Sequence, residues 1–106
     1  MERVCFTAHI RRDKLAAYTE RHGRVWPAMA DALRAAGWTN YSLFLTRDGL
    51  LIGYLETDDF AAAQQRMAQT EVNARWQADM AGFFDGIGDL RPDEGFSRVA
   101  EIFHLE

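Results

Sequence analysis

The chain has little of several features that mark particular classes of protein. It contains one cysteine among 106 residues, so no internal disulfide can form, and a reducing compartment such as the cytoplasm is predicted. No apolar run reaches the length that spans a bilayer and no secretory leader stands at the N-terminus, so no membrane attachment is expected. The basic residues form no stripe and the formal net charge is −4, which argues against nucleic-acid binding.

Motifs for metals and cofactors are also missing. His9, His22 and His104 show no metal-ligand spacing among themselves. The glycines at positions 82, 86 and 88 lack the preceding strand and the lysine of a phosphate-binding loop. Cys5 lies in an apolar, strand-like run and is interpreted as a small core residue. We therefore expect neither a metal nor a nucleotide cofactor.

What is present is enough for one folded unit. The chain is 48% hydrophobic and 12% aromatic, which is typical of a globular protein rather than a disordered one. Its length suits a single domain over residues 1–106 with one modest core. The sequence contains no internal repeat and no low-complexity tract.

Hydrophobic periodicity predicts strands and helices in alternation. Strands are expected near residues 4–11, 40–47, 50–56 and 99–105, with Asp48-Gly49 as the hairpin turn between the second and third. Residues 13–37 are predicted as one kinked helix, with Asp13 as its N-cap and Gly23 as a left-handed residue before Pro27. Two further helical stretches are expected at 60–69 and 71–84, followed by a loop over 85–95.

This order predicts the ferredoxin-like βαββαβ fold of the α+β class, with helices on one face of a four-stranded antiparallel sheet. Helices on one side would leave the other face of the sheet open. The strands are too apolar in sum for both faces of the sheet to be left in water, given Phe6, Ala8, Tyr41, Leu43, Tyr54 and Phe103. Two copies packed through their bare faces would cover them. We therefore expect a homodimer in the form of a dimeric α+β barrel.

A phenol and an imidazole stand one helical turn apart in the first helix. Tyr18 and His22 are spaced i,i+4 and project from the same face, just before Trp26-Pro27. An imidazole titrates near neutrality and can take and give a proton, so His22 is the candidate acid or base. A half-buried helix end with a core histidine would show the same spacing. Likewise, Trp76 and Tyr41 could simply pack in the core.

The motifs together resemble the L-rhamnose mutarotase family over almost the whole chain. The similarity rests on Tyr18-x-x-x-His22-x-x-x-Trp26-Pro27, on Asn40-Tyr41, on Thr70-Glu71-Val72-x-x-Arg75-Trp76 and on Glu101-x-Phe103-x-Leu105. The resemblance implies a cytoplasmic, homodimeric enzyme without cofactor that interconverts the α and β anomers of L-rhamnose or a close 6-deoxy sugar. It also implies that His22 is the proton donor and that Tyr18, Tyr41 and Trp76 contact the monosaccharide.

Two departures from the family pattern concern the sugar. Gln77 stands where family members carry a second tryptophan, and the familiar Asn-Pro-Asp-Asn-Ser-Pro loop is replaced by residues 89–95. A missing indole removes an apolar wall for the methyl group of a deoxy sugar, whereas the Gln77 amide can bind hydroxyls. Gln77 is therefore predicted to contact the substrate.

Two other classes of function remain open from the sequence. The same dimeric barrel hosts many activities, among them cofactor-independent oxygenases and lactone isomerases. A non-catalytic carrier of small ligands is the second alternative, in which His22 would only form a hydrogen bond. Oxygen consumption would identify an oxygenase, and an unchanged rate of anomeric exchange would identify a carrier.

Overall fold

The computed structural model describes all residues from 1 to 106. It contains four strands, β1 (Glu2–His9), β2 (Thr39–Leu45), β3 (Leu50–Thr57) and β4 (Ser97–Val99). Four α-helices lie between them: α1 (Leu15–His22), α2 (Pro27–Ala35), α3 (Phe60–Ala68) and α4 (Glu71–Met80). Short 3-10 turns occupy residues 12–14, 81–83 and 92–94. The predicted βαββαβ order is confirmed, with a pair of helices in each crossover.

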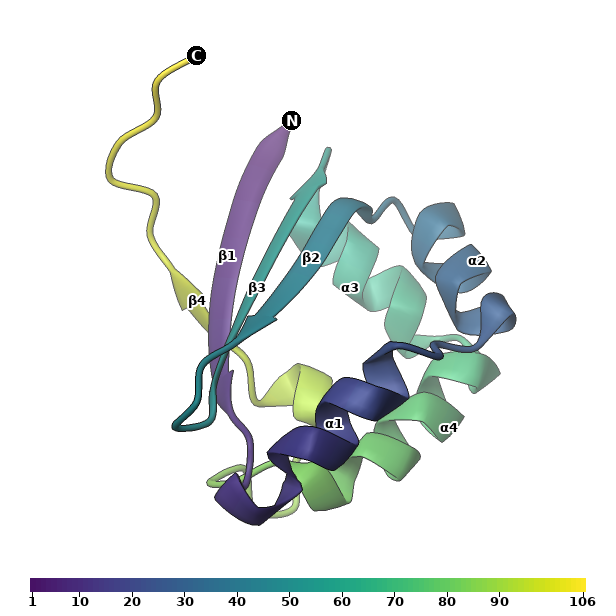
Figure 1. The fold of residues 1–106 in the computed structure, drawn as a ribbon. Coiled ribbons are helices and arrows are strands. Elements are labelled where there is room, and N and C mark those ends of the chain that lie inside the picture. Colours follow the sequence, from purple (N-terminus) through teal and green to yellow (C-terminus); the bar gives the residue numbers. More distant parts are fainter.

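The strands form one antiparallel sheet in the order β2-β3-β1-β4, which is the ferredoxin-like arrangement. Figure 1 shows all four helices on one side of this sheet, and the other side carries no layer. The hairpin between β2 and β3 turns at Asp48-Gly49 as predicted, with Gly49 at a φ of 97°. Successive residues of β1 and β3 alternate between the buried and the open face.

A β-bulge at the start of β2 decides which side chains face the helices. Thr39 pairs with Glu56 and Ser42 pairs with Tyr54, so β2 holds one residue more than β3 between these pairs. Asn40 takes up the extra residue with a φ of 47°, and its amide Nδ2 donates to Glu56 Oε1 over 2.8 Å. A bulge reverses the alternation of the strand that carries it. As a result, Tyr41 turns toward the helices instead of toward the open face.

The hydrophobic core lies between the sheet and the helices. Its sheet side includes Val4, Phe6 and Leu55, each at most 1% exposed. The Phe6 ring covers Gly53 on the neighbouring strand and stacks on the Phe96 ring, with 4.1 Å between the ring centroids. Burial of these rings provides much of the driving force for closing the helices onto the sheet.

The open face of the sheet is partly apolar. Cys5 faces this side beside Tyr54 of β3 and Val99 of β4, so its interpretation as a core residue is wrong. Phe44 on the edge strand β2 is 59% exposed on the same face. The cysteine was misjudged because an alternating strand with apolar residues on both sides does not reveal which side is covered.

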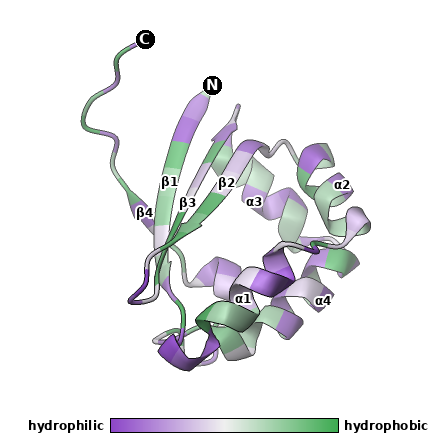
Figure 2. Ribbon diagram, viewed as in Figure 1, coloured by the Kyte–Doolittle hydropathy of each residue, from purple (hydrophilic) through white to green (hydrophobic).

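The predicted last strand is only partly formed. β4 covers Ser97–Val99 and pairs with β1, and residues 100–106 adopt no regular structure. The apolar side chains of this tail are exposed, Ile102 by 95% and Phe103 by 79%. Backbone pairing with β1 ends at Val99, although the Arg3 guanidinium still donates to the Glu101 carboxylate over 2.9 Å. The tail therefore continues beside the sheet without the backbone hydrogen bonds of a strand (Figure 1). Figure 2 shows the apolar positions of this segment, which favoured a strand here, with polar ones between them.

Other expected helix boundaries also need correction. Residues 13–37 form two separate helices because Trp26 is extended before Pro27, as the residue preceding a proline prefers. Asp13 lies in a 3-10 turn and caps no α-helix, and Gly23 is right-handed with a φ of −72°. The last helix ends at Met80, where a 3-10 turn replaces the predicted continuation to residue 84. None of the helices has the length and apolar character needed to cross a membrane.

Candidate functional site

A cavity of about 320 Å³ lies between the sheet and the helices. Ligand pockets commonly measure about 300–1,000 Å³, so this cavity suits a small molecule such as a monosaccharide. All five side chains predicted to act on or bind the substrate line it. The full lining comprises mainly apolar residues with a few polar groups: Tyr18, His22, Val25, Met29, Leu33, Trp38, Tyr41, Leu43, Met67, Asn73, Trp76, Gln77, Met80, Phe84, Pro92, Asp93 and Phe96.

His22 is held at the C-terminal end of α1 by its own helix. Its ring nitrogen Nδ1 lies 2.9 Å from the carbonyl oxygen of Tyr18. A carbonyl only accepts, so Nδ1 carries the proton and the neutral ring keeps a lone pair on Nε2. The imidazole also contacts two aromatic rings, Tyr18 at 4.2 Å and Trp76 at 5.5 Å between centroids. These contacts fix both the orientation and the tautomer of a potential base.

The surroundings favour the neutral form of His22. Burial lowers the pKa of His22 below its ordinary value of 6.5, and the nearby Arg21 guanidinium lowers it further, against the opposing hydrogen bond to Tyr18. The ring is therefore unprotonated at neutral pH. A histidine in this state is ready to accept a proton, which is the first requirement for a general base.

Two phenols face the same cavity. Tyr18 comes from α1, and Tyr41 comes from β2, where the bulge at Asn40 turns it inward. Burial raises the pKa of both phenols above the ordinary value, so each keeps its proton and can donate a hydrogen bond. No buried polar side-chain atom lacks a partner. Since neither phenol oxygen bonds to a protein group, both hydroxyls are open to the cavity.

Trp76 is fixed from several sides by neighbouring helices. Its indole packs edge-on against Trp26, with 5.0 Å between the ring centroids. Arg21 of α1 lies over the same indole at 6.0 Å and pairs with Asp79 of α4 at 2.9 Å. This ion pair joins the two helices beside the site. The indole thus forms a rigid wall of the cavity.

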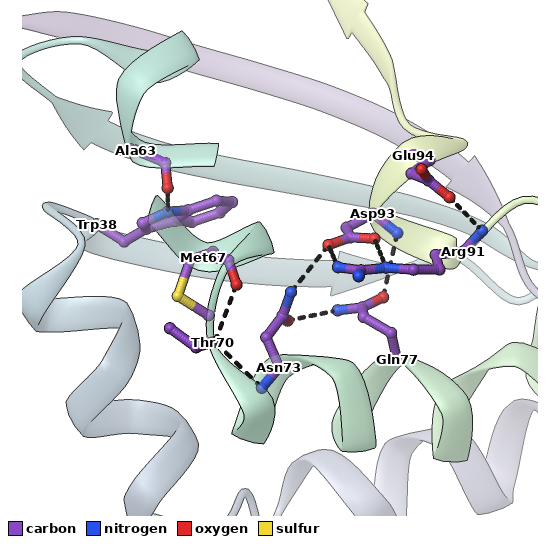
Figure 3. A network of polar contacts seen from close by, with 9 residues as sticks. All are labelled: Trp38, Ala63, Met67, Thr70, Asn73, Gln77, Arg91, Asp93 and Glu94. Carbon is purple, nitrogen blue, oxygen red and sulfur yellow. Dashed lines mark hydrogen bonds and ion pairs between the residues drawn. The ribbon is translucent and has the colours of Figure 1, made fainter. Parts of the chain in front are cut away.

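Gln77 lines the cavity, but its amide already has protein partners. The amide Nε2 donates to Asn73 Oδ1 over 3.0 Å, and Oε1 accepts from the backbone N–H of Asp93 over 3.1 Å. Figure 3 shows this amide between helix α4 and the segment Arg91–Glu94. The prediction that Gln77 contacts the substrate stays a prediction. In the structure, the Gln77 amide attaches the segment Arg91–Glu94 to helix α4.

The structure also places residues in the cavity that sequence reasoning did not select. Asn73 is 1% exposed and lies one helical turn before Gln77, a spacing that could have drawn attention to it. Asp93 belongs to the loop that departs from the family pattern, and only the fold brings it beside α4. Trp38 precedes β2 and Phe96 precedes β4, which are the two edge strands of the sheet. No pattern along the chain relates these positions to one another.

The titratable side chains of the structure form no metal-binding group. Three or more histidine, cysteine or acidic side chains are nowhere close enough together to hold an ion. The polar groups on the residues that line the cavity are one imidazole, two phenols, two amides, one carboxylate and the N–H groups of two indoles. This set can donate and accept hydrogen bonds around a polyol and can transfer protons through the imidazole.

The chain is similar over nearly its whole length to known proteins. The model of the L-rhamnose mutarotase family matches residues 3–105. Relatives named L-rhamnose mutarotase are 37% identical in Bacillus subtilis and 39% identical in Burkholderia cenocepacia, each covering 100% of both chains. The crystal structure of L-rhamnose mutarotase from Formosa agariphila matches with a TM-score of 0.81 at 24% identity over 100% of both chains.

A more distant structure shares the fold. A type-II polyketide cyclase from Streptomyces glaucescens is 15% identical and has a TM-score of 0.55, with 100% of both chains covered. This likeness concerns the fold alone, since the ferredoxin-like barrel hosts many activities. The match over nearly all residues and the identity to the curated relatives are far more specific. The chain belongs to the L-rhamnose mutarotase family.

Proposed function

We propose that this chain, as one domain over residues 1–106, is an L-rhamnose mutarotase that interconverts the α and β anomers of L-rhamnose or a close 6-deoxy sugar. The observation that carries the assignment of roles is His22, whose Nδ1 is occupied by the Tyr18 carbonyl in a cavity lined by Tyr41 and Trp76. Such an imidazole offers one free basic nitrogen to a bound sugar. Family membership makes the reaction an isomerisation.

The reaction needs only proton transfers. His22 Nε2 takes the proton of the anomeric hydroxyl while the bond between the anomeric carbon and the ring oxygen breaks. The bonding electrons go to the ring oxygen, which receives the proton that His22 has taken up, directly or through the Tyr18 hydroxyl. An open-chain aldehyde results and His22 is neutral again. Rotation of the aldehyde and reversal of the same steps close the ring on the other face. Each positioned acid or base contributes about 10²–10⁴-fold, so neither a metal nor a nucleotide is required.

The remaining side chains bind and orient the sugar in this proposal. Tyr18, one turn from His22, donates a hydrogen bond to the ring oxygen or passes it a proton. Tyr41 binds a second hydroxyl, since its own hydroxyl has no protein partner. Trp76 packs its indole against the apolar C–H face of the sugar. Gln77 holds the segment Arg91–Glu94 against the cavity through its bond to the Asp93 N–H. The second proton on its Nε2 is donated to a sugar hydroxyl.

The two alternative classes have less support. An oxygenase or lactone isomerase on the same barrel rests only on the shared fold, whereas relatives that are 37% and 39% identical carry the name of a mutarotase. A carrier would use the free Nε2 of His22 only to accept a hydrogen bond, and the family to which the chain belongs is one of isomerases. The rate of anomeric exchange separates a carrier from an enzyme.

We expect the purified protein to accelerate anomeric exchange of L-rhamnose in the presence of a chelator. The measurement is the exchange rate between anomer signals by saturation-transfer NMR, with buffer and a heat-denatured sample as controls. A panel of hexoses and 6-deoxy hexoses defines the preferred sugar. Exchange rates equal to those in buffer for every sugar would refute the proposal.

The homodimer is part of the same proposal. The open face with Cys5, Phe44 and Tyr54 and the exposed Ile102 and Phe103 of the tail together offer an apolar surface to a second copy. We expect light scattering to give the mass of a dimer at micromolar concentration. Removal of residues 100–106 should weaken the dimer, and a full-length protein of monomeric mass would contradict the model. The single free cysteine supports a cytoplasmic location.

A further inference from the structure

A hydrogen-bonded chain of side chains joins helix α4 to the segment Arg91–Glu94 (Figure 3). Gln77 donates to Asn73 over 3.0 Å, and Asn73 Nδ2 donates to Asp93 Oδ2 over 3.1 Å. The backbone N–H of Asp93 donates to Gln77 Oε1, so the three residues form a closed ring of hydrogen bonds. The two amides are nearly inaccessible, since Asn73 is 1% and Gln77 7% exposed. The Asp93 carboxylate is therefore fixed in position by buried partners.

Arg91 holds the same carboxylate from the other side. Its Nε donates to Asp93 Oδ1 over 3.1 Å, and a terminal nitrogen donates to Oδ2 over 2.8 Å. A bidentate pair of this kind fixes the plane of the carboxylate. Asp93 lines the cavity and Arg91 does not. The Asp93 carboxylate therefore borders the cavity, while the Arg91 guanidinium that pairs with it lies outside the cavity lining.

The count of hydrogen bonds leaves one position on the carboxylate unused. A carboxylate accepts about four hydrogen bonds, two at each oxygen. Oδ2 receives two, from Arg91 and Asn73, whereas Oδ1 receives one, from Arg91. The Asp93 side chain is 23% exposed, so its free position is within reach of a ligand. A hydroxyl of a bound sugar is the donor that this position lacks.

We propose that Asp93 is a substrate-binding residue that accepts a hydrogen bond from one sugar hydroxyl at Oδ1 and thereby sets which hydroxyl the substrate must carry. The inference rests on the proposed function, because it takes the ligand to be a monosaccharide. A site built to bind a hydroxyl discriminates strongly against an analogue lacking it, because the buried polar group is then left unpaired. Gln77 and the altered loop thus act together: the glutamine positions the aspartate.

The test pairs a change in the protein with a change in the sugar. Equilibrium binding by NMR titration is measured for L-rhamnose, for its analogues deoxygenated at the second, third or fourth carbon, and for L-mannose, which adds a hydroxyl on the methyl group. Asp93→Asn is compared with the wild type, and Asp89→Asn is the control. Asp89 is exposed in the same loop and does not line the cavity. Its substitution removes one negative charge, as Asp93→Asn does, but changes no group that a bound sugar could contact.

We expect Asp93→Asn to weaken binding of the preferred sugar by about 10- to 100-fold, the range for one hydrogen bond to a charged group. The analogue lacking the bound hydroxyl should bind both proteins equally, and Asp89→Asn should match the wild type. Equal weakening of every sugar, or weakening of none, would overturn the assignment. If Asp93→Asn does not fold, Asp93→Glu, which keeps the charge but displaces it, is subject to the same criterion.

Failure of this inference is distinguishable from failure of the proposed function. Binding that depends on one hydroxyl and on Asp93, without accelerated anomeric exchange, would refute the mutarotase and support the role of Asp93. Accelerated exchange in which no single hydroxyl accounts for the effect of Asp93→Asn would support the mutarotase and refute the role of Asp93. Absence of binding for every sugar of the panel would overturn both.

Discussion

Replacement of His22 by asparagine is expected to slow anomeric exchange of L-rhamnose by about 10²–10⁴-fold, the contribution of one positioned general acid or base. Asparagine can still donate from its amide toward the Tyr18 carbonyl that now bonds Nδ1, but it cannot titrate near neutrality. The fold and much of the sugar affinity should therefore persist. The exchange rate at saturating sugar tests the loss of catalysis, the dissociation constant tests the retained sugar affinity, and the melting temperature tests the retained fold.

Two companion variants make the result specific. Tyr18→Phe should reduce the rate less, because it removes one hydroxyl and keeps the ring that packs against His22. His9→Asn, at the exposed end of β1, should alter stability more than rate. A fully folded His22→Asn protein with near-normal exchange would remove His22 from the mechanism. Loss of activity only in proportion to lost folded protein would give His22 a structural role.

The pH dependence follows from the same histidine. Because the pKa of His22 lies below 6.5 in the folded protein, the wild-type rate should rise through that lower pKa and be level above 6.5. His22→Asn should lack this step. The unfolded chain binds its proton more readily, so the contribution of His22 to stability is complete above pH 6.5 and is lost as the pH falls through the lower pKa.

Substitution of Gly53 by alanine is expected to destabilise the protein by about 1–3 kcal/mol through overpacking. A Cβ at this position would lie 2.2 Å from Cζ of Phe6, far inside van der Waals contact. Phe6 is 1% exposed and stacks on Phe96, so its ring has no free space to move into. The melting temperature should fall by about 4–8 °C for each kcal/mol lost.

A smaller partner should relieve the same clash. In the double variant Gly53→Ala with Phe6→Leu, the added methyl occupies room left by the ring, so the destabilisation should be less than the sum of the single variants. Gly82→Ala is the matched control, since an added Cβ there meets nothing within 4 Å. Strict additivity of the two substitutions would show that the ring does not confine position 53.

Local patterns in the sequence were sufficient for the order of elements and for the Tyr18–His22 pair. Alternation and i,i+4 spacing depend on neighbours along the chain, which the sequence shows directly. The last strand was overpredicted for the same reason: residues 99–105 are nearly apolar and favour a strand, but backbone pairing with β1 ends at Val99.

Long-range contacts explain what the sequence could not reveal about the site. Tyr41 and Trp76 were selected through their resemblance to family motifs, whereas their approach to one cavity depends on the packing of α4 and β2. The link between Gln77 and Asp93 spans 16 positions and passes through a backbone N–H, a group that every non-proline residue has. The two departures from the family pattern were therefore recognised separately, and only the structure shows that they touch.

The bulge in β2 has a consequence for insertions and deletions. Edge strands usually tolerate changes of length near their ends. Here, loss of Asn40 would remove the extra residue of the bulge and leave Tyr41 opposite Leu55, so Tyr41 and Leu43 would still face the helices. Loss of a residue from the regular part of β2, residues 42–45, would instead shift the alternation by one and turn Tyr41 away from the cavity. Gaps in an alignment of functional relatives should therefore be tolerated at position 40 and be rare at positions 42–45.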